Sequence, residues 1–270
     1  MTLLHVNDIG HGYRTGGLLA RRGWLQVLDG IQLEFKAGES VGLLGSSGSG
    51  KSTLARLLLG LETPAHGQVT FAGQDVSRLR GRQAHAFQSA VQLVFQDAPG
   101  AFNPQRSIGW SIAEPLRHLS DLDSAARDQR VLNLLQQMGL GEEHAQRLPH
   151  QLSGGQLQRA NIARALALSP QLVVLDEALS NLDRVLQLQL LQRLEALRRE
   201  SGTAFVLITH DLSLVRYFCQ RVLLLDAGRI VEDRPVDGDL SFDHEVGKQL
   251  QAAILPTRPF KPEAANLRTG

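Results

Sequence analysis

The chain has 270 residues, and 43% apolar against 20% charged residues supply enough apolar sequence to bury a sizeable core, which excludes disorder over most of the length. With 28 basic and 27 acidic residues the net charge is only +1, and no Lys/Arg stripe stands out, so a nucleic-acid partner is not expected. Because no window approaches about 18 consecutive apolar residues and the N-terminus lacks a basic and then apolar leader pattern, we expect neither a membrane span nor a secreted protein.

Strand signals and one glycine-rich turn fill the first part of the chain. Ile31, Leu33 and Phe35 alternate with polar neighbours, which predicts a half-buried strand in an antiparallel edge sheet. The apolar run 41–44 then leads through glycines into a helix over 51–59 that ends at Gly60. This part of the sequence therefore predicts a strand, a loop and a helix in succession.

Short apolar runs predict the remaining strands. They lie at Val69–Phe71, Val91–Phe95, Leu172–Leu175, Phe205–Ile208 and Val222–Leu225. Several of these runs are too uniformly apolar to leave one face in water, which is typical of strands at the centre of a parallel sheet. The sequence therefore indicates an α/β fold.

Helical spacing dominates between residues 100 and 168, so we expect a helical insertion there. Its recurring apolar positions are Val131, Leu134, Leu135 and Met138. A second apolar stripe predicts a helix that packs on the sheet and ends at Gly202. This stripe consists of Leu186, Leu190, Leu194 and Leu197. The prolines after about residue 255 stand among polar neighbours and predict a poorly ordered tail over residues 256–270.

The strongest chemical signal is a phosphate-binding loop between a predicted strand and a predicted helix. Its residues are Gly45, Ser46, Ser47, Gly48, Ser49, Gly50, Lys51, Ser52 and Thr53. Glycines let the backbone wrap so that N–H groups and the helix N-terminus point at a β-phosphate. Lys51 reaches the β- and γ-oxygens, and the Ser52 hydroxyl coordinates Mg²⁺. The alternative, a Gly/Ser-rich turn with an accidental lysine, does not account for both flanking elements.

Two adjacent carboxylates, Asp176 and Glu177, follow the apolar run 172–175. Strand alternation points them in different directions. Asp176 can then hold the magnesium sphere through water or Ser52, while Glu177 faces the γ-phosphate and polarises the attacking water. A strand that simply ends in acidic surface residues is the alternative, and the phosphate loop weakens it.

A Ser-Gly-Gly turn opens a helix after Leu152. Its residues are Ser153, Gly154, Gly155 and Gln156. This segment resembles the signature motif of ATP-binding cassette (ABC) proteins, and the resemblance covers residues 3 to about 253. It implies that the segment works in trans, on the γ-phosphate that a partner's phosphate loop holds. The serine hydroxyl, the glycine amides and the helix N-terminus of the segment would contact that phosphate. For Ser153 in isolation, a plain helix N-cap is the alternative.

The resemblance also implies roles for three further polar residues. Gln96 matches the glutamine that completes the magnesium shell and senses the transmembrane partner. Asp183 lies in the place of the dimer-crossing loop, where Asn181 replaces the commoner alanine. His210 matches the switch histidine that contacts the γ-phosphate.

One aromatic residue is expected to stack on adenine. We assign this role to Tyr13, with Trp24 as the weaker competitor because the segment 16–23 between them is loop-like.

Within the family, the chain resembles the dipeptide, oligopeptide and nickel import subfamily. The segments that carry this likeness are Gln96–Asp97, Asn103–Gly109, Ala113–Leu116 and Leu250–Ala253. Ser180–Asp183 and Phe218–Arg221 look closer to the nickel-importing members than to the peptide cassettes. The resemblance therefore implies energising of nickel(II) uptake, with dipeptide or oligopeptide import as the alternative. No His or Cys cluster has metal-ligand spacing, so the transported ion is not expected to touch this chain.

Other classes of protein account for less of the sequence. A cassette ATPase of nucleic-acid metabolism or ribosome handling carries two cassettes, long coiled coils or zinc modules. This chain is too short to hold these additions, which disfavours that class. A small-molecule kinase shares the phosphate loop but does not explain Ser153–Gln156 or His210. We expect the lone Cys219 to be a small buried hydrophobic residue in a reducing compartment, and not a catalytic thiol.

These observations combine into one architecture. Residues 1–255 are expected to form one ABC transporter nucleotide-binding domain: a P-loop NTPase core sheet, an antiparallel edge sheet and a helical subdomain at about residues 98–168. The resemblance implies that ATP and Mg²⁺ lie between two cassettes, the second being a paralogous ATPase subunit. It also implies two transmembrane permease subunits and a periplasmic substrate-binding protein. The chain would lie peripherally on the cytoplasmic face of the inner membrane, attached only through the permease.

Overall fold

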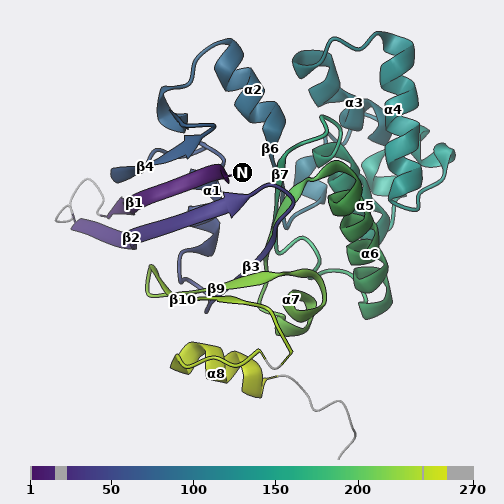
Figure 1. Ribbon diagram of the computed structural model, residues 1–270. Coiled ribbons are helices and arrows are strands. Elements are labelled where there is room, and N and C mark those ends of the chain that lie inside the picture. The colour runs from purple at the N-terminus through teal and green to yellow at the C-terminus, as the bar shows by residue number, and fades with distance from the viewer. Residues whose placement is uncertain (1, 16–22, 239, 254–270) are drawn as a thin grey trace, which may run out of the picture.

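The computed structural model describes residues 2–15, 23–238 and 240–253 (Figure 1). The segment 256–270, for which a poorly ordered tail is expected, lies outside the described residues, as do residues 16–22 between the two candidate aromatics. The described chain forms two β-sheets with helices packed around them.

The first sheet is antiparallel, with strand order β2-β1-β4-β5. Its strands are β1 (Thr2–Thr15), β2 (Gly23–Lys36), β4 (His66–Phe71) and β5 (Gln74–Asp75). The predicted alternation in β2 is confirmed, because Ile31, Leu33 and Phe35 are buried while Gln32 and Glu34 are exposed. The predicted strand Val69–Phe71 also belongs to this sheet, where β4 pairs with β1.

The second sheet has strand order β10-β9-β3-β8-β7-β6. Its strands are β3 (Ser40–Leu44), β6 (Val91–Val94), β7 (Leu172–Asp176), β8 (Ala204–Ile208), β9 (Arg221–Asp226) and β10 (Arg229–Pro235). All neighbouring pairs are parallel except β9 with β10. Every residue of β3 and β8 is buried, which confirms the prediction of central strands without an exposed face.

Helices lie between and around the sheets (Figure 1). They are α1 (Lys51–Leu58), α2 (Arg82–Ala90), α3 (Ile108–Leu119), α4 (Ser124–Gln137), α5 (Gly154–Ala165), α6 (Arg184–Ser201), α7 (Leu212–Phe218) and α8 (Glu245–Ala252). Short 3₁₀ turns occur at η1 (Val76–Arg78), η2 (Pro99–Ala101), η3 (Glu142–Gln146) and η4 (Pro149–Gln151). Helix α6 ends at Gly202 as predicted, with a φ of 70° that suits glycine.

Two hydrophobic clusters cover the two faces of the parallel sheet. On one face, Val206 and Ile208 of β8 pack with α1 and the inner side of the antiparallel sheet. On the other face, Phe205 and Leu207 pack with residues of α3 to α7. Residues along β8 therefore alternate between the clusters, as expected for a strand buried on both sides.

Residues 98–168 contain α3, α4, α5 and three of the 3₁₀ turns, with no strand. The predicted apolar positions Val131, Leu134, Leu135 and Met138 are buried there. Helix α3 packs on both α4 and α5, and α5 packs against β6. This helical segment, at the upper right of Figure 1, therefore shares its core with one face of the parallel sheet.

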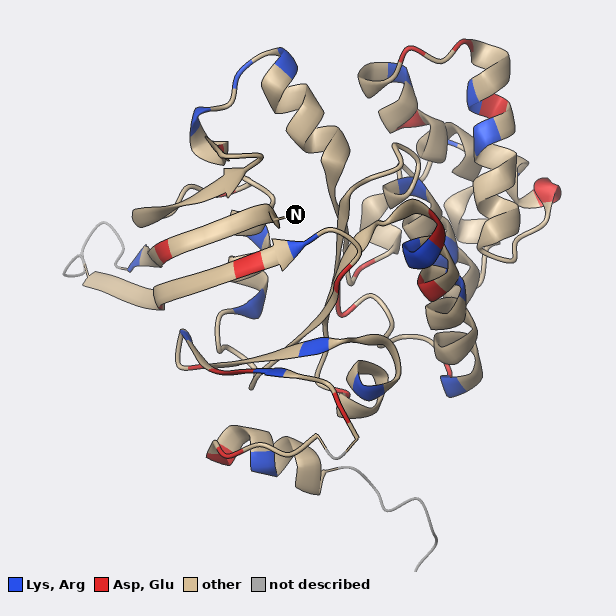
Figure 2. Cartoon of the chain, in the orientation of Figure 1, with Lys and Arg blue, Asp and Glu red and all other residues tan. Residues whose placement is uncertain are grey.

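Acidic and basic residues are interspersed along the described helices and strands (Figure 2). Within the described chain, no helix combines the length and apolarity needed to cross a bilayer.

Candidate functional site

The carboxyl ends of four neighbouring parallel strands meet at the candidate site. Strand β3 leads to Gly45, β8 to Thr209, β7 to Asp176 and β6 to Phe95 and Gln96. Because these strands are adjacent in the order β3-β8-β7-β6, their ends line one edge of the sheet. That edge is where open α/β sheets bind ligands.

The predicted phosphate loop joins the buried strand β3 to helix α1. Two of its glycines are needed for packing. A Cβ on Gly45 would lie 2.2 Å from the Leu225 carbonyl oxygen, and one on Gly50, whose φ is 108°, would lie 2.7 Å from Leu28 Cδ2. The loop therefore approaches β9 and β2 so closely that a larger residue at either position would collide with them. Inside it, the Ser49 hydroxyl is buried without a hydrogen-bond partner among the described residues.

The Lys51 side chain is buried and folds back onto the loop. Its Nζ donates hydrogen bonds to the Gly45 carbonyl at 2.9 Å and the Ser46 carbonyl at 2.8 Å. Burial lowers the pKa of this ammonium, and the nearby charges of Glu177 and Asp176 act in the opposite direction. The Lys51 ammonium is thus largely shielded from water at the loop, and an anionic ligand there would stabilise its positive charge.

Asp176 and Glu177 stand at the end of β7, and each lies beside a different predicted site residue. Burial raises the pKa of the Asp176 carboxyl group, and the neighbouring Ser52 hydroxyl acts in the opposite direction. The Glu177 Oε2 atom accepts a hydrogen bond of 2.9 Å from Gln96 Nε2. The structure therefore brings together Lys51, Ser52 and Gln96 with both carboxylates.

The backbone of Glu177 is strained. Its φ of 47° lies in the left-handed region, and its N–H donates to the Ile208 carbonyl of β8 at 3.0 Å. A non-glycine residue in this region costs about 1–2 kcal/mol. Strained backbone is enriched at functional sites, although among the described residues Asp8, Ala72, Ser169 and Ala227 also have a positive φ.

The candidate signature segment begins helix α5 as predicted, with Ser153 as its N-cap. The Gln156 N–H donates to Ser153 Oγ at 3.3 Å, and the Ser153 N–H donates to Gln156 Oε1 at 2.9 Å. Within the part of the chain that the structure describes, the side-chain hydrogen bonds of Ser153 and Gln156 do not reach residues 45–53. This pattern leaves the signature segment outside the cluster around Lys51.

Asp183 and His210 occupy the loops after β7 and β8. Asp183 caps helix α6 by accepting the Leu186 N–H at 3.0 Å. His210 is exposed, between the buried Thr209 and the α7 N-cap Asp211. The two loops are linked by Arg184, whose Nη1 lies 3.0 Å from Asp211 Oδ2. Arg184 was not among the predicted site residues, because no motif distinguishes it from an ordinary helix residue.

Of the two candidate aromatics, Tyr13 reaches the phosphate-loop helix. Its hydroxyl lies 3.3 Å from Thr53 Oγ1 and donates to Glu62 Oε2 at 2.9 Å. His11 Nε2 lies 3.0 Å from the same Glu62 oxygen. Trp24 is half-exposed on β2, next to Leu25 that pairs with Tyr13. Glu62 and His11 were not identified as site residues, because their contact with Tyr13 depends on the folded sheet.

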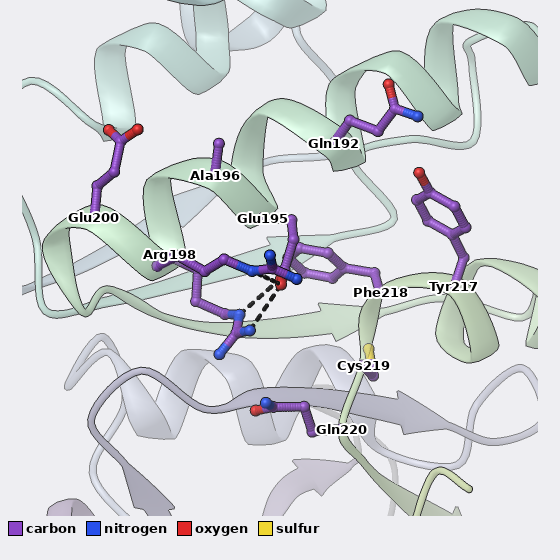
Figure 3. Close-up of a pocket in the computed structure, with 10 residues that line it drawn as sticks. Gln192, Glu195, Ala196, Arg198, Glu200, Tyr217, Phe218, Cys219 and Gln220 are labelled. Carbon is purple, nitrogen blue, oxygen red and sulfur yellow. Dashed lines mark hydrogen bonds and ion pairs between the residues drawn. The ribbon is translucent and has the colours of Figure 1, made fainter.

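A groove of about 720 Å³ lies apart from these residues, between α6 and α7 (Figure 3). Glu195 in this groove already pairs with Arg198 at 2.7 Å and Arg199 at 2.8 Å. Cys219 is buried, and burial raises the pKa of its thiol, so it is the unreactive hydrophobic residue that we expected. The groove contains none of the predicted site residues.

Relatives of this chain match it over nearly its whole length. Relatives named nickel import ATP-binding protein NikE come from several bacteria. The one from Pseudomonas putida is 80% identical, over 96% of this chain and 95% of the relative. That from Rhodospirillum rubrum is 52% identical, over 95% and 93%. That from Escherichia coli is 46% identical, over 97% of each chain.

Solved structures share the fold. The dimeric ATP-binding cassette MJ0796, in a post-hydrolysis state bound to ADP and Pi, matches with a TM-score of 0.79 at 28% identity, over 88% of this chain and all of that one. The cassette cbiO1 from Clostridium perfringens, part of the ABC transporter complex cbiONQ, matches with a TM-score of 0.73 at 25% identity, over 87% and 89%. The ABC transporter family itself matches residues 28–180. Together with the identities above, this match establishes that the chain belongs to the ABC transporter family of ATP-binding cassette proteins.

Proposed function

We propose that this chain binds and hydrolyses ATP with Mg²⁺ and thereby energises the import of nickel(II) through a membrane permease. The observation that carries the ATPase part is the meeting of five predicted residues at one sheet edge. Gln96 donates a hydrogen bond to Glu177, Asp176 lies beside Ser52, and the charges of both carboxylates act on the Lys51 ammonium.

Binding of the phosphates is assigned to the loop 45–53. Lys51 donates two hydrogen bonds to the carbonyls of Gly45 and Ser46. A phosphate oxygen offers this buried cation a negative charge, which a carbonyl does not, so the exchange favours the bound state. The amides at the start of α1 add the positive end of a helix dipole to the same place.

Magnesium would be held by the oxygens of Ser52, Asp176 and Gln96. When bound, it would neutralise charge on the phosphate oxygens. The donor set fits a hard cation, since it consists of a hydroxyl, a carboxylate and an amide oxygen. Gln96 uses its amide nitrogen on Glu177, which leaves its amide oxygen for the metal. Burial that raises the pKa of Asp176 also favours a positive partner for its carboxylate.

Activation of the attacking water is assigned to Glu177. Gln96 fixes its Oε2 oxygen, and the constrained backbone at φ 47° sets the direction of the side chain. The other oxygen is then available to accept a proton from water. His210, on the neighbouring strand end, would contact the γ-phosphate.

The second half of each site would come from a partner cassette. Ser153–Gln156 stand apart from the phosphate loop within one chain, which suits a role in trans. Asp183 would face the same interface from the start of α6. Tyr13 would stack on adenine, because its hydroxyl is anchored beside the phosphate-loop helix at Thr53.

The transport role rests on the relatives. Three relatives at 80%, 52% and 46% identity are named as nickel import ATP-binding proteins, and each match spans nearly the whole chain. We therefore place the chain with a paralogous ATPase subunit, two permease subunits and a periplasmic substrate-binding protein, on the cytoplasmic face of the inner membrane. Import of dipeptides or oligopeptides is the second candidate, because the segments Asn103–Gly109 and Ala113–Leu116 resemble that subfamily as well.

Uptake measurements in a deletion strain test this role. Under nickel limitation, we expect loss of radiolabelled Ni²⁺ accumulation with normal uptake of a labelled dipeptide. The wild-type gene should restore nickel uptake, and a matched Lys51→Ala allele expressed at the same level should not. Normal nickel uptake with lost dipeptide uptake would move the chain to the peptide importers and leave its ATPase assignment unaffected.

A further inference from the structure

A buried histidine, His144, lies directly behind the candidate signature segment. It belongs to the 3₁₀ turn η3, which packs against α3 and α4, and only 8% of its surface is exposed. Its Nε2 atom lies 3.1 Å from Nε2 of Gln156, the third residue of helix α5. The residue is therefore in contact with the segment that the proposed function assigns to the partner's γ-phosphate.

The hydrogen-bond partners determine which ring nitrogen of His144 carries the proton. Gln156 Oε1 accepts the Ser153 backbone N–H, so the amide nitrogen of Gln156 must face His144. An amide nitrogen only donates, which requires His144 Nε2 to be the unprotonated acceptor. On the other side, His144 Nδ1 lies 3.0 Å from the Gly141 carbonyl and 3.2 Å from Glu143 Oε1, which are both acceptors. The proton therefore sits on Nδ1.

These contacts form one continuous chain of hydrogen bonds. It runs from the Gly141 carbonyl through the imidazole of His144 and the amide of Gln156 to the backbone N–H of Ser153. The Gln156 N–H returns to Ser153 Oγ. A rotation of the Gln156 amide would break the bond to Ser153 N–H and place two donors or two acceptors against each other.

We propose that His144 is a positioning residue for the signature segment. By accepting from Gln156, it fixes the orientation of that amide and thereby the position of Ser153. The Ser153 hydroxyl and the first-turn amides of α5 are then held ready for the γ-phosphate of a partner cassette. This inference rests on the proposed function, since it gives His144 a part in closing the composite site.

Two amide substitutions separate this role from a local structural one. His144→Gln can place an oxygen near the Nε2 position and keep an acceptor for Gln156. His144→Asn can place its amide near the Nδ1 position and keep the donor to Gly141, but it leaves Gln156 without a partner. His144→Leu removes both contacts at similar volume.

The measurement is ATP-driven dimerisation with the paralogous ATPase subunit, in a Glu177→Gln background that slows hydrolysis of the ligand. We expect His144→Gln to behave like the parent. His144→Asn and His144→Leu should need about two- to tenfold more ATP for half-dimerisation, the range expected for one lost hydrogen bond. The affinity of the dilute monomer for ATP should stay the same in all variants, because the phosphate loop is untouched.

The opposite pattern, with His144→Asn restored and His144→Gln impaired, would show that His144 only anchors its own turn. Equal dimerisation of all variants would also overturn the inference. If the parent fails to dimerise with the paralogous subunit in ATP, the composite site of the proposed function fails, and the role of His144 is then decided by its tautomer. The tautomer can be tested on the wild-type protein. Nitrogen NMR of histidine-labelled protein should find an unprotonated Nε2 and a protonated Nδ1 at His144. A protonated Nε2 in the neutral ring would contradict the contact with Gln156.

Discussion

The strained backbone at Glu177 yields a stability prediction that is independent of any nucleotide. Its φ of 47° costs a side chain with a Cβ about 1–2 kcal/mol, whereas glycine adopts this region freely. Glycine in turn loses about 0.5–1 kcal/mol more conformational entropy on folding than alanine. The difference leaves glycine favoured over alanine at this position by up to about 1.5 kcal/mol.

The test compares Glu177→Gly with Glu177→Ala. Both variants lack the carboxylate and its hydrogen bond to Gln96, so they differ only in the Cβ. Thermal unfolding should give the glycine variant a Tm about 2–4 °C above that of the alanine variant for each 1 kcal/mol. The measurement is made without nucleotide and with a chelator, because a bound ligand would stabilise the folded state. ATPase activity should be lost in both variants.

An alanine variant more stable than the glycine variant would refute the reasoning. It would mean that the backbone at this position is not in the left-handed region, and that Glu177 is not aimed by local strain.

The remaining predictions concern ligand binding and pH. Lys51→Ala should abolish MgATP binding in a fluorescence titration while its circular dichroism spectrum stays native. The exposed control Lys36→Ala should bind MgATP normally. MgATP binding by a folded Lys51→Ala variant would contradict the phosphate-loop assignment. With the paralogous subunit present, Glu177→Gln should bind ATP, slow hydrolysis by about 10²–10⁴-fold and accumulate as a dimer with that subunit in sizing experiments. Adding Ser153→Arg should return it to the monomer. Burial raises the pKa of the Asp176 carboxyl group above its value in the unfolded chain, so ionisation of this group favours the unfolded state. The folded protein therefore loses stability as pH rises above about 4, where the carboxyl group ionises in the unfolded chain. Asp176→Asn should therefore raise the Tm of the nucleotide-free protein at pH 7, and a lower Tm would contradict the stated cause of the shift.

Local sequence was sufficient for the features that sit on single elements. The phosphate loop, the carboxylate pair and the signature turn each follow or begin one regular element, so periodicity and glycine placement located them. The fully buried strands β3 and β8 were equally visible, because a short uninterrupted apolar run bounded by turn residues is typical of a strand covered on both faces.

Other elements escaped for physical reasons. Strand β1 has shifts of register between Val6 and Ile9, which disturb the period of two that marks a strand. Helices α7 and α8 have only 7 and 8 residues, too short for a clear helical period. The predicted helix over 51–59 ends one residue earlier, at Leu58.

The parts of the site that sequence did not reveal are tertiary contacts. Glu62 meets Tyr13 only because helix α1 packs beneath the antiparallel sheet, and His144 meets Gln156 across a turn that packs on two helices. No sequence pattern predicts the positive φ of Glu177, because glutamate rarely adopts this conformation and the neighbouring residues do not indicate it.

The central claim is that two chains build each ATP site, one with its phosphate loop and the other with its signature segment. Variants of this chain in complex with the paralogous ATPase subunit test it most directly, because a photoreactive ATP analogue labels the two phosphate loops on separate chains. Lys51→Ala disables this chain's own phosphate loop and keeps its signature segment, whereas Ser153→Arg does the reverse. We predict that Lys51→Ala abolishes nucleotide trapping on this chain, and that Ser153→Arg abolishes it on the partner subunit. Full trapping on the partner subunit in the folded Ser153→Arg complex, or loss of trapping on this chain alone, would contradict the claim.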